Sequence, residues 1–125
     1  MTEDITVPEG ESTVIEEGCQ LFFHKSTGMI VEGNLAVEGT KEQPVLFTSI
    51  NDSLSPEKTD LAPDSSRWNG ILIGGTCRRS VEFSRFTLAW SSYGIRSRKS
   101  QVVISGGIFR HNETSNFMIE TVVPI

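Results

Sequence analysis

The chain has 125 residues, a hydrophobic content of 37% and a formal net charge of −5. This length and composition allow one buried core, and no run approaches the roughly 18 apolar residues of a membrane-spanning helix, which excludes such a span. The negative charge and the absence of any nucleic-acid-binding motif argue against a DNA or RNA partner.

Short hydrophobic segments, closed by Gly, Asn, Pro or Thr, follow one another along the chain. Runs this brief, rich in Val, Ile, Leu and Phe, are typical of strands, because a helix needs roughly 10 or more periodic residues. In chain order the segments are residues 12–15, 19–23, 28–31, 35–37, 44–47, 70–73, 80–83, 85–88, 94–95, 101–104, 107–109 and 116–119.

The segments recur at a nearly fixed distance, which indicates a solenoid. Gly28, Gly70, Gly94 and Asn116 open equivalent segments, with steps of 24 residues from Gly70 to Gly94 and 22 from Gly94 to Asn116. The first step is 42 residues, about one ordinary repeat if residues 51–67 are set aside as a loop. Three strands per turn over about five turns predict three parallel sheets around a dry core.

Several of these segments carry a family resemblance. Val7-Pro-Glu-Gly10, Thr13–Gly18, Leu35–Thr40, Pro44–Ser49 and Trp68-Asn-Gly-Ile71 resemble the opening coils of right-handed parallel β-helix proteins of the pectin-lyase-like class. The resemblance covers most of residues 5–112 and implies an all-β, right-handed parallel β-helix (solenoid) of about five coils with three short strands per coil. That class includes polysaccharide lyases, glycoside hydrolases, phage tailspikes, adhesins and structural repeats, so it specifies a scaffold rather than a function.

The whole chain, residues 1–125, is predicted to form one β-helix domain. Residues 50–67, with two prolines and many Asp and Ser residues, are predicted to be a loop inserted between coils. The predicted coils lie near residues 5–27, 28–49, 68–91, 93–115 and 116–125. Since side chains alternate along a strand, the inward residues are expected to be Val14, Ile30, Val37, Leu46, Ile71, Val81, Ile95, Val103 and Ile108.

Charge is divided unevenly between the two halves. Residues 1–66 carry a formal charge of −10 and residues 67–125 a charge of +5. In the basic half, stacked turns predict a cationic ridge that could hold the sulfate, carboxylate or phosphate groups of an acidic glycan; the alternative is a set of solvated turns. The ridge residues are Arg78, Arg79, Arg98 and Lys99, extended by Arg85 and Arg96.

Other chemically distinctive residues give weaker predictions. Trp68 could stack on a sugar or anchor the inserted loop against the sheet. Cys19 and Cys77 are expected to be free thiols two layers apart, with Cys19 as a small core residue. His24 and His111 lie about four coils apart, too far to bind one metal ion, and are expected in turns or at the surface.

Catalytic motifs of the resembled class do not occur in the sequence. The strings Asn-Thr-Asp, Asp-Asp and Gly-His-Gly are missing, and Asp occurs only at positions 4, 52, 60 and 64, which offers no calcium site. Glu82 and Glu120 are the only acids on later strands, and neither has an evident partner for glycoside hydrolysis. No catalytic residue, cofactor or metal ligand is therefore predicted.

The ends of the predicted solenoid suggest a fragment or a chain capped by a partner. Residues 116–125 stop within a coil, and residues 1–4 are too short for a capping helix. Self-association is expected through Phe117, Ile119 and Val122, head to tail because the two halves carry opposite charges.

Three functions remain open at this stage. The first is a non-catalytic β-helix repeat domain that acts as a rigid structural or interaction module. The second is a binding module for acidic polysaccharide, and the third a truncated polysaccharide lyase or glycoside hydrolase. The first residues show no export signal, whereas the resemblance favours an extracellular or cell-surface protein. The sequons at Asn51 and Asn112 could accept glycans or could be chance triplets.

Overall fold

The computed structural model of the chain describes residues 4–56, 58–74, 81–98 and 102–119. These residues form strands and one short 3-10 helix, and all the strand pairs among them are parallel. The predicted all-β class and the parallel pairing are thus confirmed. The elements are β1 (Ile5–Val7), β2 (Ser12–Glu16), β3 (Gln20–Phe23), β4 (Gly28–Val31), β5 (Asn34–Glu38), β6 (Val45–Ser49), η1 (Pro63–Ser65), β7 (Gly70–Ile73), β8 (Val81–Ala89), β9 (Ile95–Ser97), β10 (Val102–Arg110) and β11 (Phe117–Ile119).

The first sheet has the strand order β1-β4-β7-β9-β11. Each of these strands belongs to a separate layer, a layer being one circuit of the chain through the sheets. Gly28 pairs with Gly70, and the register of the neighbouring strands places Gly94 and Asn116 in the same column, as the spacing predicted. A Cβ at Gly70 would lie 2.2 Å from the carbonyl oxygen of Gly94, and this residue has φ of 102°. Only glycine fits that position, because it tolerates both the close approach and the backbone angle.

The second sheet has the order β2-β5-β8-β6-β3, with β10 also paired to β8. The prediction of three sheets with three strands in every coil is wrong here, because β8 and β10 are single nine-residue strands. One half of β8 pairs with β5 and the other half with β6. Arg85, with φ of 50°, and Gly106, with φ of 67°, bend β8 and β10 at equivalent positions, so the two strands turn a corner without ending.

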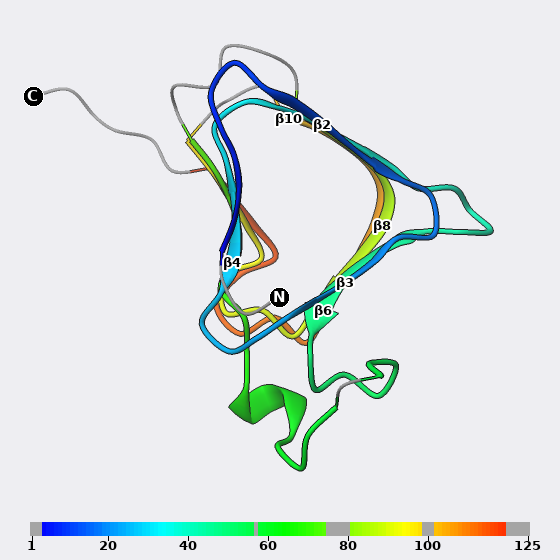
Figure 1. The fold of residues 1–125 in the computed structure, drawn as a ribbon, viewed down its shortest axis with the longest axis vertical. Helices are drawn as coiled ribbons and strands as arrows, with labels where there is room; N and C mark the ends of the chain where they lie inside the picture. Colours follow the sequence, from blue (N-terminus) through cyan, green and yellow to red (C-terminus); the bar gives the residue numbers. More distant parts are fainter. Residues whose placement is uncertain (1–3, 57, 75–80, 99–101, 120–125) are drawn as a thin grey trace, which may run out of the picture.

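Viewed along the direction in which the strands stack, the layers overlie one another and outline a three-sided figure (Figure 1). Apolar side chains from both sheets fill its interior, and the largest buried ones include Phe23, Met29, Phe47, Phe83 and Phe86. The rings of Phe83 and Phe86 are 5.3 Å apart at their centroids. Burying such a side chain contributes about 1.5–3 kcal/mol relative to leaving it exposed, so this core is the main source of stability.

The inward positions were predicted correctly for Val37, Ile71, Val81 and Ile95, which are all buried. Ile30 and Leu46 are half-buried, on the outer face of their strands, so the inward prediction is wrong for these two residues.

Three more of the predicted inward residues also point outward: Val14, Val103 and Ile108 are 56%, 59% and 47% exposed. The register places Val14 in one column with Ala36, Glu82 and Val103, and alternation puts that whole column on the outer face. The inward residues beside them are Ile15, Val102, Ile104 and Phe109. The prediction was therefore shifted by one residue at these sites.

The segment between β6 and β7 projects from one corner of the three-sided outline (Figure 1). Asn51, only 2% exposed, holds it together: its Nδ2 donates to Ser66 Oγ at 2.8 Å, and its Oδ1 accepts from the backbone N–H of Thr59 at 2.7 Å. Ser49 Oγ, at the end of β6, donates to the carbonyl oxygen of Ser66 at 3.1 Å. A buried polar network of this kind fixes the segment to the sheet because each group would be costly to leave unpaired.

Candidate functional site

The predicted cationic ridge is only partly within the described residues. Arg78, Arg79 and Lys99 lie outside them. Arg98 directly follows β9 in the first sheet, whereas Arg85 lies at the bend of β8 in the second sheet. The predicted extension of the ridge through Arg85 is therefore not seen.

Arg96 is half-buried, and its guanidinium lies over the ring of Tyr93, with 4.3 Å from Cζ to the ring centroid. This cation–π contact contributes about 0.5–1 kcal/mol at a surface site. The contact places the Arg96 guanidinium beside Tyr93, on the outer face of the first sheet, where Arg96 is paired with Leu72.

Trp68 is fully buried, so the prediction that it stacks on a sugar is wrong. Its ring stacks on Phe23, with centroids 4.3 Å apart and planes inclined by 7°. The indole N–H donates to the carbonyl oxygen of Ala89 at 2.8 Å. Trp68 thus anchors the end of the inserted segment to the core, which was the alternative interpretation.

A second aromatic stack, absent from the sequence-based predictions, lies at the same corner. Trp90 has His111 stacked on it at 4.2 Å between ring centroids, and Arg67 Cζ lies 5.5 Å from a Trp90 ring centroid. Arg67 also donates to the carbonyl oxygen of His111, and its Nε lies 3.6 Å from a carboxylate oxygen of Glu113. The repeat length could have indicated this cluster, because Arg67, Trp90 and His111 are 23 and 21 residues apart, close to one repeat.

Both sequon asparagines use their side-chain amides inside the fold. Asn112 Oδ1 accepts from the backbone N–H of Ser91 at 3.0 Å and from Ser91 Oγ at 2.6 Å, while its Nδ2 donates to the carbonyl oxygen of Leu88 at 3.1 Å. Asn51 Nδ2 is likewise occupied by Ser66. In this structure the nitrogen that would carry a glycan is engaged at both sites.

The remaining predicted residues are dispersed. Cys19 is exposed at the corner before β3, so the expectation of a core thiol is wrong, and Cys77 lies outside the described residues. Glu82 is exposed on the outer face of β8, and Glu120 is not described. Phe117, in β11, is 37% exposed. Ile119 closes β11 and Val122 lies outside the described part of the chain.

Neither a cluster of metal-binding side chains nor a membrane-spanning helix is found in the described ranges. No group of three or more His, Cys, Asp or Glu side chains there is placed to hold a metal ion. No helix in that part of the chain is long and apolar enough to cross a membrane.

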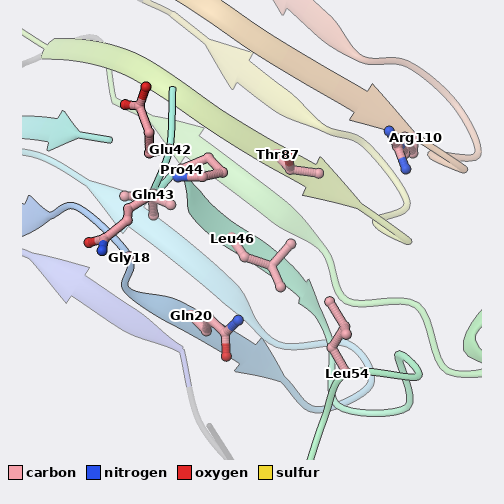
Figure 2. A pocket seen from close by; sticks show the side chains of 10 residues that line it. Gly18, Gln20, Glu42, Gln43, Pro44, Leu46, Leu54, Thr87 and Arg110 are labelled. Atoms are coloured by element: carbon pink, nitrogen blue, oxygen red, sulfur yellow. The ribbon is translucent and has the colours of Figure 1, made fainter. Parts of the chain in front are cut away.

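A groove of about 590 Å³ lies on the outer face of the second sheet (Figure 2). Its floor comes from adjacent strands, because Gln20 pairs with Leu46 and Leu46 with Thr87 in the register of β3, β6 and β8. Arg110, at the end of β10, lies beyond Thr87 at one end of the line of side chains in Figure 2. The complete lining is Gly18, Gln20, Glu42, Gln43, Pro44, Val45, Leu46, Leu54, Thr87 and Arg110.

One wall of the groove is the loop between β5 and β6. The carbonyl oxygen of Gln43 accepts from the backbone N–H of Gly18 at 3.0 Å and from that of Thr40 at 3.1 Å. Thr40 Oγ1 accepts from the N–H of Gln43 at 3.0 Å and lies 3.2 Å from a carboxylate oxygen of Glu17, to which it donates. These bonds hold Gln43 and Pro44 against the preceding layer.

The opposite wall is Leu54, 64% exposed, in the inserted segment. Asp52 fixes its backbone, because one carboxylate oxygen accepts from the N–H of Leu54 and the other from Thr48 Oγ1 on β6, both at 2.9 Å. Both walls are therefore tied to the strands that form the floor.

Comparisons with known proteins give one partial similarity. No family model and no solved structure matches the chain. Over 60 residues, 48% of this chain, it is 32% identical to Protein bark beetle of Drosophila melanogaster. The matched segment makes up 2% of that protein, so the likeness concerns a small part of a much longer chain.

Proposed function

We propose that this chain is a right-handed parallel β-helix repeat module of the pectin-lyase-like kind, with a rigid structural or interaction role and no catalysis. The observation that supports the proposal is the unbroken parallel register of the first sheet, in which five strands from successive layers align in one column. A fold in which each layer contacts only its neighbours is suited to extension and to display of a long surface.

The partial likeness to a far longer protein is in keeping with a module inside a larger assembly, and a cell-surface or extracellular setting is part of the proposal. The interaction would use the two end layers. Among the described residues, β10 and β11 each pair on one side only, with β8 and β9. Such an edge can accept a further parallel strand from a neighbouring repeat or a second copy of the chain.

Charge favours contact between opposite ends. The first layer exposes Glu11, Glu16 and Glu17, whereas the last layer exposes Arg98 and Arg110. Head-to-tail stacking would bring acidic and basic layers together and cover Ile104 and Phe109, which are only partly buried at the last layer.

Sedimentation velocity over a concentration series tests this interaction. Reversible association is expected at low salt and should weaken at high salt because the end charges are screened. Ile104→Asp should reduce association because Ile104 faces inward at the end layer, whereas Val103→Asp, on the same strand but the outer face, should not. A strict monomer at high concentration and low salt would contradict the proposed end contact.

A further inference from the structure

We propose that the groove on the outer face of the second sheet binds an extended peptide of a partner protein, which places one aliphatic side chain between Leu46 and Leu54 and a carboxylate on Arg110. The inference goes beyond the end-to-end contact proposed above, because the groove lies on the outer face of the stack and not on the cross-section of an end layer. Three features carry it: exposed aliphatic side chains, side-chain amides and two opposite charges.

Aliphatic side chains are exposed in and beside the groove. Leu46 and Leu54 both line it and lie close together in Figure 2. Leu54 is 64% exposed, and Ile108, which pairs with Thr87 in the neighbouring strand, is 47% exposed. Exposed apolar side chains that gather beside a cleft are typical of a surface that contacts another protein.

The side chains of Gln20 and Gln43 suit a peptide main chain. Each amide carries a carbonyl acceptor and an NH₂ donor, the same two kinds of group that a peptide bond presents. The hydroxyl of Thr87, on the next strand after Leu46, also donates and accepts. Within the described part of the chain, no hydrogen bond is found from the side chains of Gln20, Gln43 or Thr87, so these groups are available to a ligand.

The two charged side chains of the groove have opposite sign and come from different elements. Glu42 lies in the loop before β6, and Arg110 lies two residues after Ile108 in β10, on the same outer face. Neither Glu42 nor Arg110 forms an ion pair among the described residues. A peptide with an acidic residue at one end and a basic residue at the other would pair with both, and a carboxylate can accept two parallel hydrogen bonds from arginine.

The dimensions of the groove set the length of the peptide. The outward column from Gln20 to Ile108 spans three strand spacings, or about 14 Å. An extended chain advances about 3.3 Å per residue, so about four or five residues cover that distance. The volume of about 590 Å³ lies within the usual range for small ligands, about 300–1,000 Å³. Since hydrogen bonds hold both walls to the floor, little of the site has to be ordered on binding.

Two other occupants account for less of the groove. A sugar is disfavoured because none of the described lining residues is aromatic, which leaves a pyranose ring without a stacking surface. A strand added to β3 is the second alternative, because β3 pairs only with β6 within the described ranges. Such a strand would lie beyond Gln20, at the edge of the first layer, and would not reach Thr87 or Arg110.

The test is a titration of the ¹⁵N-labelled chain with two acetylated and amidated pentapeptides, Lys-Ser-Leu-Ser-Glu and the reverse order Glu-Ser-Leu-Ser-Lys, followed by heteronuclear NMR. We expect one of the two orders to shift the side-chain amide signals of Gln20 and Gln43 and the backbone amides of Leu46 and Thr87. The same peptide with serine in place of leucine should bind about 10-fold more weakly, because its central side chain buries little apolar surface.

Two variants and a matched control locate the contacts. Arg110→Glu should raise the dissociation constant about 10-fold or more through loss of a charge-assisted hydrogen bond, and a peptide with lysine in place of glutamate should recover affinity for this variant. Leu54→Ser should weaken binding of the leucine peptide about 3- to 10-fold and leave that of the serine peptide unaltered. Both replaced residues are exposed, so signals outside the groove should not move. Lys25→Glu reverses a charge at an exposed position outside the groove and should leave the affinity unaltered.

Four results would overturn the proposal. These are the absence of groove shifts with both peptide orders, shifts confined to β3, affinity unchanged in both Arg110→Glu and Leu54→Ser, or tighter binding of cellotetraose than of either peptide at the groove. Shifts confined to β3 would indicate strand addition, and tighter binding of cellotetraose would indicate a sugar site. Because none of these outcomes involves the state of association, they are independent of the sedimentation test.

Discussion

The inserted segment, residues 50–67, is attached to the sheets by a few buried side chains that carry polar groups. Trp68 lies directly after that segment and combines a stacked ring with a buried hydrogen bond to Ala89. Its position in the sequence, at the end of a polar stretch, was compatible with both a sugar platform and an anchor. Only burial separates the two, and burial depends on Phe23 and Ala89, which come from other layers.

Replacing Trp68 with Phe should lower the free energy of unfolding by about 1–3 kcal/mol, because the Ala89 carbonyl would stay buried without its donor. Trp90→Phe is the matched control. Trp90 is half-buried and contacts Arg67 and His111 at the surface, so its replacement should cost less than about 1 kcal/mol. Urea unfolding followed by circular dichroism measures both values, and equal losses would contradict the anchoring role.

Strands and their register were largely predictable from the sequence, because glycine and asparagine mark the same column in each repeat. The inward residue was not predictable where apolar side chains follow one another without alternation. In the runs Val14-Ile15 and Val102-Val103-Ile104, hydrophobicity alone does not choose a face, and the predictions took the outer residue. The groove could not be predicted, since its lining combines four strands with three connecting segments.

The continuous bent strands β8 and β10 were also missed, for a conformational reason. Arg85 adopts a positive φ that non-glycine residues rarely take, so nothing in its identity indicates a bend within a strand. Gly106, at the equivalent position of β10, is the residue expected for that angle.

Replacing Gly106 with Ala should therefore destabilise the protein in two ways. A side chain at φ of 67° costs about 1–2 kcal/mol, and the added Cβ would lie 2.7 Å from Cδ of Arg85. Gly10→Ala is the control, because Gly10 has φ of 85° but no atom within 4 Å of the added Cβ. Thermal unfolding should show a larger fall in melting temperature for Gly106→Ala than for Gly10→Ala. The difference between the two variants should become smaller when both are made in an Arg85→Ala background. If Arg85→Ala left the difference in melting temperature between the two variants unchanged, a clash with Arg85 would be excluded.

At the scale of the whole molecule, layers contact mainly the layers next to them, so stability should vary along the stack. β7 pairs with β4 on one side and β9 on the other, whereas β1 and β11 pair on one side among the described residues. Strands with two neighbours can exchange their amide protons only when more of the structure opens.

Hydrogen exchange should therefore be slowest in β4, β7 and β8 and fastest in β1 and β11. Two substitutions of the same inward column sharpen the test, because Phe83 in β8 pairs with Ile104 in β10. Phe83→Ala removes a fully buried ring between layers and should speed exchange throughout both sheets, with a loss of about 3–5 kcal/mol in the free energy of unfolding. Ile104→Ala affects a partly buried residue of the last layer and should speed exchange chiefly in β10. Uniform acceleration by both variants would mean that the stack unfolds as a single unit, and the layer-by-layer account of its stability would then be wrong.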